Sequence, residues 1–232
     1  MLSALWPMPA AASTIAVTEA PRRCVAVDPI DLDEAPDPAD TCRVVAFGRV
    51  KGAMPPLLYQ LQVWLGDGQA AQTQRIAAGL QVGGPSSNGA GAAVLRPAGK
   101  GLLRLVAGAA GRSAVITEPR LVRTAQVPIV VVPAGATISM HPNLDLVFRV
   151  VGGRWTEVTG AWMEHVRTPH GVAQRHGNVV DWLRLRAFGA FWKPPDAECC
   201  PTGGSYVARL RLDGRHLVLD SIRYYRGDLP FP

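Results

Sequence analysis

Short stretches of alternating apolar and polar residues recur along the chain, and turn-forming residues separate them. Residues 57–65 (LLYQLQVWL) place Tyr59, Leu61, Val63 and Leu65 on one face of an extended segment. A period of two is typical of a half-buried β-strand. Further short strands are expected at residues 42–50, 102–106, 114–116 and 125–132.

The C-terminal half begins with a predicted hairpin at residues 145–158. Two alternating runs flank Gly152 and Gly153, and two glycines between strands favour a two-residue turn of a primed type, which needs positive φ. This turn places Val150 opposite Trp155.

A second hairpin is predicted at residues 206–219 (YVARLRLDGRHLVL), with Asp213 and Gly214 in its turn. Pairing outward from this turn puts Leu212 opposite Arg215, and it gathers the remaining apolar residues on one face. A shift of register by one residue would move that apolar set into water, so the turn and the pattern support each other.

Residues 181–188 (DWLRLRAF) alternate in the same way, with leucines on the inner face and Trp182, Arg184 and Arg186 on the outer face. Together with the two hairpins, this strand predicts a mainly β (or α+β) protein. We expect an antiparallel sheet in a sandwich- or barrel-like arrangement with few short helices.

One stretch has helical character, because residues 69–81 are Ala-rich and place Ile76 and Leu80 four positions apart. The following residues 83–91 (GGPSSNGAG) predict a flexible loop. We interpret this loop as an internal seam in the chain.

The seam suggests a division into a β-rich N-terminal part, residues 13–85, and a β-rich C-terminal part, residues 86–232. The alternative that both parts form a single domain stays open. Residues 28–40 are an acidic loop broken by prolines, and residues 1–12 are similar to the remnant of a secretory signal peptide.

The net charge is +6, from 24 Lys and Arg against 18 Asp and Glu, and it is unevenly distributed. Residues 1–47 hold three cations and seven carboxylates, so the remainder carries +10. Of the 24 cations 21 are Arg, which suits bidentate contacts with phosphate and carboxylate. Composition alone is explained more simply by a GC-rich genome, but the arginines alternate with apolar residues as on exposed strand faces.

This alternation predicts a binding surface for an envelope protein or a polyanionic or glycan ligand. The candidate surface comprises Trp182, Arg184, Arg186, Arg209 and Arg211. Nucleic acid ranks last among the partners, since no run of arginines resembles a nucleic-acid-binding arm.

Four tryptophans, Trp155, Trp162, Trp182 and Trp192, fall within 38 residues. Large aromatic residues dominate the cores of small β-domains, so a buried cluster is favoured over an exposed stacking platform. Trp182 is the exception, because strand alternation places it with the arginines.

The four cysteines are Cys24, Cys42, Cys199 and Cys200. An exported protein would oxidise them, and four cysteines allow three pairings. We expect a Cys24–Cys42 staple, whose 18-residue separation contributes about 3 kcal/mol in the chain-entropy model. For Cys199 and Cys200 a structural role is favoured; the alternative is thiol–disulfide redox activity or another enzymatic activity that uses these cysteines.

The RWTEV segment at residues 154–158 is followed by Ala-Trp at 161–162, Trp-Lys at 192–193 and CCPTGG at 199–204. Over residues 141–225 this arrangement resembles uncharacterised bacterial exported proteins with a C-terminal CCP[ST]GG segment, and it is similar to actinobacterial LppP/LprE-type lipoproteins. The resemblance implies an envelope location and an unassigned function, and it implies no catalytic residue. The start of the chain departs from the lipoproteins in having no lipobox cysteine.

Sequence motifs for catalysis do not stand out. The chain has no G-x-S-x-G elbow, P-loop or HExxH segment, and its apolar runs fall short of the ~18 residues that a spanning helix requires. We therefore predict a periplasmic or secreted, non-catalytic binding or structural module, with no metal and no cofactor.

Overall fold

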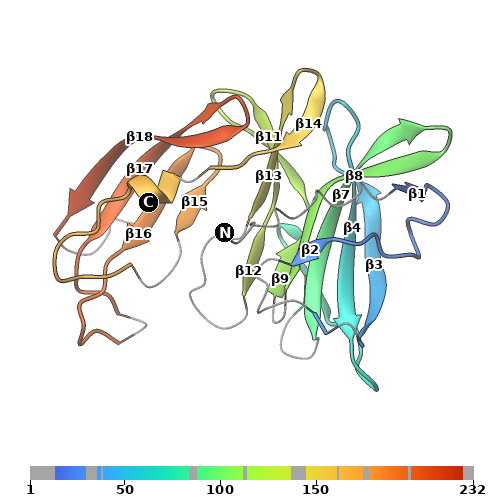
Figure 1. Cartoon of the computed structure of the whole chain (residues 1–232), viewed down its shortest axis with the longest axis horizontal. Helices are drawn as coiled ribbons and strands as arrows, with labels where there is room; N and C mark the ends of the chain where they lie inside the picture. The colour runs from blue at the N-terminus through green and yellow to red at the C-terminus, as the bar shows by residue number, and fades with distance from the viewer. Residues whose placement is uncertain are drawn as a thin grey trace, which may run out of the picture.

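Strands account for nearly all of the regular structure, and they form four sheets arranged from one side of the molecule to the other (Figure 1). The computed structural model of the chain describes residues 14–29, 36–37, 39–83, 88–111, 114–136, 145–160, 162–174, 178–197 and 200–226. Among these residues the single helical element is the 3-10 turn η2 (Trp162–His165). The predicted mainly β fold is confirmed. One sheet curls into a half-barrel, and within the described part no helix is long and apolar enough to cross a membrane.

The first sheet has the strand order β1-β8-β7-β4-β3, and the short strand β2 pairs in parallel with β8. Its strands are β1 Thr14–Ala16, β2 Asp28–Pro29, β3 Thr41–Arg49, β4 Leu58–Leu65, β7 Gly89–Gly99 and β8 Leu102–Gly111. The strands predicted at residues 42–50, 57–65 and 102–106 are confirmed. β8 is longer than predicted because its small residues, 107–111, pair with β7.

The second sheet has the order β12-β9-β6-β5, from β5 Thr73–Ile76, β6 Gly79–Gly83, β9 Ala114–Thr117 and β12 Ala134–Ala136. The helix predicted at residues 69–81 is wrong, because this stretch forms the β5–β6 hairpin. Ile76 pairs with Gly79 across the turn. Gly79 has φ +121°, a conformation that glycine adopts readily and that a helix cannot contain.

The loop predicted at residues 83–91 is also shorter than expected. β6 ends at Gly83 and β7 begins at Gly89, while residues 84–87 lie outside the described part. A Cβ at Gly91 would come 2.8 Å from Trp64, so this glycine serves close packing rather than flexibility. β7 pairs with β4, and the first sheet therefore contains strands from both sides of residue 85.

The central sheet has the order β10-β11-β13-β14, from β10 Arg120–Arg123, β11 Pro128–Val132, β13 Leu146–Val151 and β14 Arg154–Glu157. The predicted hairpin is confirmed, with Val150 opposite Trp155. Both faces of this sheet are buried. Val130 and Phe148 belong to the core shared with the first two sheets, and Val131 and Val147 belong to the core shared with the C-terminal sheet.

The C-terminal sheet has the order β15-β16-β17-β18, from β15 Val179–Asp181, β16 Arg186–Ala190, β17 Ser205–Asp213 and β18 His216–Tyr225. The β17–β18 hairpin is confirmed, but its register differs from the prediction by two residues, since Leu212 pairs with Leu217. Asp213 pairs with His216, so Gly214 and Arg215 are the two central residues of the turn. Of these two, only Gly214 has positive φ, +54°. A shift of two leaves every side chain on its predicted face.

The single strand predicted at residues 181–188 is wrong, because residues 182–185 form the turn between β15 and β16. The carboxylate of Asp181 accepts a hydrogen bond from the backbone N–H of Arg184 at 3.1 Å, the interaction by which aspartate starts a turn. Leu185 then adopts φ +51°, which is incompatible with an extended strand.

Candidate functional site

The C-terminal sheet has one buried and one exposed face. Along β17, alternate apolar residues up to Leu212 are buried, whereas Arg209 and Arg211 between them are exposed. The cross-strand register places Arg186 of β16 directly opposite Arg209. The exposed face therefore brings together three of the five residues predicted for the binding surface.

A fourth arginine, Arg223, belongs to the same face, and the sequence analysis missed it. Arg223 is exposed and lies opposite Val207. The predicted hairpin ended at Leu219 because the alternating pattern breaks there. In the structure Asp220 is the extra residue of a β-bulge, which shifts the alternation of β18. The resumed alternation of Ser, Arg and Tyr at 221, 223 and 225 is the signal that could have revealed it. We name Arg186, Arg209, Arg211 and Arg223 the arginine face.

The arginine face has few carboxylate partners. Arg211 contacts Asp213 at 3.3 Å, but both side chains are largely exposed, so the pair contributes little. Within the described part of the chain, Arg186, Arg209 and Arg223 form no ion pair. The face therefore carries positive charge that the protein itself does not neutralise.

Trp182 does not belong to this face, in contrast to the prediction. Its side chain is only 7% exposed, and its indole N–H donates to Asp145 Oδ2 at 2.5 Å. Alternation does not set its direction, since it lies in a turn. The other three tryptophans, Trp155, Trp162 and Trp192, are buried as well, which confirms that they are not an exposed stacking platform. They do not form one cluster, since Trp155 belongs to one core and Trp162 and Trp182 to another.

Arg184 is exposed on the same turn and is held by Asp181 through a 2.8 Å ion pair. Burial alone would raise the pKa of Asp181, but the hydrogen bonds and charge of Arg184 outweigh it and lower that pKa. Arg184 lies on this turn rather than on a strand of the sheet and is paired with Asp181, so it is not counted in the arginine face.

A second group of arginines lines a groove of about 380 Å³. Arg96 comes from β7, Arg154 from the start of β14, and Arg215 from the turn between β17 and β18. The groove also contains Leu105 and Val106 of β8, which supply apolar surface. The remaining lining residues are Trp155, Thr156, Glu157 and Thr159.

Backbone contacts fix the position of Arg215 at this groove. The N–H of Thr159 donates to the carbonyl of Arg215, and the N–H of Leu217 donates to the carbonyl of Thr159, both at 2.9 Å. Arg96 lies directly opposite Arg104 of β8, which forms a second pair of facing arginines. Four separate segments of the chain contribute to the groove, so no local motif could reveal it.

Glu157 is the one carboxylate that lines the groove. Its burial raises its pKa, and the charge of nearby Asp28 raises it further. The groove therefore combines three guanidinium groups with a carboxyl group that binds its proton more tightly than a free glutamate. Within the described residues, none of these three arginines forms an ion pair.

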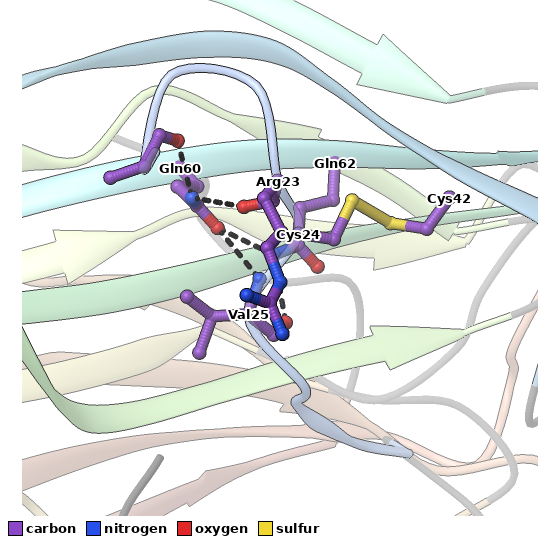
Figure 2. The surroundings of a disulfide bond; sticks show 7 residues. Arg23, Cys24, Val25, Cys42, Gln60 and Gln62 are labelled. Carbon is purple, nitrogen blue, oxygen red and sulfur yellow. Dashed lines mark hydrogen bonds between the residues drawn. A yellow bond between two sulfur atoms is a disulfide. The ribbon is translucent and has the colours of Figure 1, made fainter. Parts of the chain in front are cut away.

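The predicted disulfide Cys24–Cys42 is present, with a sequence separation of 18 (Figure 2). Cys42 lies on β3, and Cys24 lies on the N-terminal segment, residues 14–29. The disulfide attaches this segment to the first sheet. A structural staple between Cys24 and Cys42 is thereby confirmed.

Two glutamines on β4 hold the same segment by hydrogen bonds, and both are fully buried. Gln60 donates to the carbonyls of Ala20 and Arg23, and it accepts from the N–H of Val25 at 3.1 Å (Figure 2). Gln62 donates to the carbonyl of Val25 at 3.0 Å. The N-terminal segment thus covers the face of β4 on which Gln60 and Gln62 lie.

Several predicted features lie outside the described residues: Cys199, the signal-like residues 1–12, and most of the acidic loop at 28–40. Cys200 is disulfide-bonded. The described residues contain no cluster of three or more His, Cys, Asp or Glu that could hold a metal ion.

Comparison with known proteins adds no relationship. No family model, curated protein or solved structure matches this chain.

Proposed function

We propose that the protein is a non-catalytic binding module of the bacterial cell envelope, and that its arginine face binds a polyanionic ligand. The observation that carries this proposal is the pairing of Arg186 with Arg209. Like charges directly opposite each other on a sheet destabilise it. An anion bound between the two side chains would turn that repulsion into attraction.

The chemistry of the face supports an extended anion with several charges. Guanidinium groups bind phosphate and carboxylate through paired hydrogen bonds. Arg211 and Arg223 lie on neighbouring strands beside the Arg186–Arg209 pair, so one glycan carrying repeated charges could contact several of them at once. Val207 and Phe188, which are cross-strand neighbours and partly buried, offer apolar surface between the arginines.

The compartment is proposed on two grounds. The Cys24–Cys42 disulfide is consistent with an oxidising, extracytoplasmic environment. The resemblance of the C-terminal half to bacterial exported proteins favours the periplasm or secretion.

The test compares two triple variants with equal net charge. One variant, R186Q/R209Q/R223Q, removes the unpaired arginines of the face. The other, R49Q/R75Q/R120Q, removes three exposed arginines on strands of the other sheets. The probe is polygalacturonate, a carboxylated glycan, with affinity measured by titration calorimetry at several salt concentrations.

We expect the face variant to lose at least about tenfold in affinity, since hydrogen bonds to charged groups contribute about 1.5–3 kcal/mol each. The control variant should lose much less. Equal losses in the two variants would show that only net charge matters, and this would contradict the proposal. Duplex DNA bound as tightly as the glycan would contradict it as well.

A further inference from the structure

We propose that the groove lined by Arg96, Arg154 and Arg215 is a second binding site, and that it takes a phosphate monoester of a small organic molecule. This site is separate from the arginine face and does not depend on the function proposed for it. Three observations support it: the charge of the groove, its mixture of surfaces and the way its residues are fixed.

The charge of the groove suits a dianion. Arg96, Arg154 and Arg215 line it, and Arg104 faces Arg96 across the β7–β8 hairpin. The nearby carboxyl groups are Glu157 in the groove and Asp28 beside it. The lining itself holds three guanidinium groups against one carboxyl group, an excess of two positive charges that equals the charge of a fully ionised phosphate monoester.

The surfaces of the groove suit an organic ester better than a bare ion. Leu105 and Val106 line one side with apolar side chains that are only partly buried. Thr156 and Thr159 add hydroxyl groups that can donate or accept hydrogen bonds. The volume of about 380 Å³ lies within the range of small-molecule sites.

The groove is held in shape by backbone interactions rather than by the arginines themselves. Thr159 forms an isolated parallel bridge with His216, and two 2.9 Å hydrogen bonds join it to the β17–β18 hairpin. Arg154 follows the Gly-Gly turn of the β13–β14 hairpin. The backbone positions of Arg154 and Arg215 are therefore set before a ligand arrives, which lowers the ordering cost of binding.

The test uses titration calorimetry with three probes: glucose 6-phosphate, glucuronate and glucose. The proposal predicts saturable binding of glucose 6-phosphate, with at least tenfold weaker binding of the neutral glucose. Glucuronate should also bind more weakly than the phosphate ester, because it carries a single charge. Equal or tighter binding of glucuronate would overturn the assignment to phosphate.

The variants R96Q, R154Q and R215Q should each weaken binding of glucose 6-phosphate about tenfold, in line with a lost charge-assisted hydrogen bond. R75Q is the matched control and should leave this affinity unchanged, because Arg75 is exposed on β5 opposite Leu80 and lies in neither proposed site. The proposal is overturned if glucose 6-phosphate does not saturate the protein, or if R75Q weakens binding as much as the groove variants. Thermal unfolding of each variant checks that the fold is intact.

The two proposals fail separately. Loss of polygalacturonate binding in the face variant with unchanged glucose 6-phosphate affinity supports both sites. If instead the groove variants lost affinity for both polygalacturonate and glucose 6-phosphate, while the face variant kept both affinities, the arginine face would be refuted and the groove supported.

Discussion

Arg186 and Arg209 lie directly opposite each other on β16 and β17. The carboxylate nearest in register, Asp181 opposite Arg186, is already held by Arg184 at 2.8 Å. The repulsion between the two arginines is therefore a cost that the free protein carries. Such a cost is retained where the charges serve a purpose other than stability.

Replacing Arg209 by threonine should raise the stability of the free protein, since it removes the repulsion and adds a β-branched residue to a strand. The expected gain is about 0.2–1 kcal/mol, measured by urea unfolding at low salt. R75T is the control, because Arg75 lies opposite Leu80 and has no facing charge. A gain no larger in R209T than in R75T would contradict the idea of a repulsive pair.

Trp182→Phe should destabilise the protein and leave polygalacturonate binding unchanged. The substitution removes the indole donor that Asp145 accepts in a position that is 7% exposed. The lost hydrogen bond to the partly buried carboxylate of Asp145 costs about 1.5–3 kcal/mol, which chemical denaturation can resolve. Weaker glycan binding at unchanged stability would instead return Trp182 to the binding surface.

Gln60→Leu should destabilise the protein by at least about 2 kcal/mol, although leucine is similar in size. The change leaves the carbonyls of Ala20 and Arg23 and the N–H of Val25 without their buried partner, and each unpaired group costs about 1–3 kcal/mol. Gln74→Leu on the exposed strand β5 is the control and should change stability by less than about 0.5 kcal/mol. Hydrogen exchange should locate the loss in residues 14–29.

Removal of the staple in the double variant C24A/C42A should lower the free energy of unfolding by about 3 kcal/mol, because an 18-residue loop is released in the unfolded chain. The double variant is preferable to a reducing agent, which would also act on the disulfide of Cys200. A loss below about 1 kcal/mol would show that the glutamine contacts alone hold the N-terminal segment.

Glu157→Gln should stabilise the protein at neutral pH and have little effect in acid. Burial and Asp28 raise the pKa of Glu157 in the folded state, so the folded protein binds this proton more tightly than the unfolded chain. The corresponding stability is complete below the unfolded pKa, about 4.3, and is lost as the pH rises through the folded pKa. Glutamine mimics the protonated form at every pH.

Urea midpoints of the Glu157→Gln variant and the wild-type protein should thus coincide near pH 4 and separate as the pH approaches 7. A constant difference across this range would indicate an effect of packing rather than of ionisation.

Local sequence patterns were sufficient where strands are joined by tight turns. The β13–β14 hairpin follows from Gly152 and Gly153, and the faces of the β17–β18 hairpin follow from its alternating leucines. These features depend on neighbours in the sequence, since a primed turn and a period of two together define a register. The same logic misread residues 69–81, where Ala-rich composition hid a turn at Ala77 and Ala78.

Local patterns did not predict which residues with polar groups are buried. Gln60 and Gln62 alternate with apolar neighbours as solvent-facing residues do, yet both are fully buried under a segment about 40 positions away. Trp182 alternates with arginines, yet an aspartate 37 positions away holds it in the core. In each case a long-range hydrogen bond offset the cost of burial.

By itself the chain determined that this is a mainly β protein, which of its hairpin residues point inward, and that Cys24 lies within reach of Cys42. Those outcomes rest on side-chain period, turn geometry and short separations. Only the tertiary structure decided which arginines share a face and that Arg96, Arg154 and Arg215 meet at one groove, because sheet register and the packing of one sheet on another bring together residues that no local pattern connects.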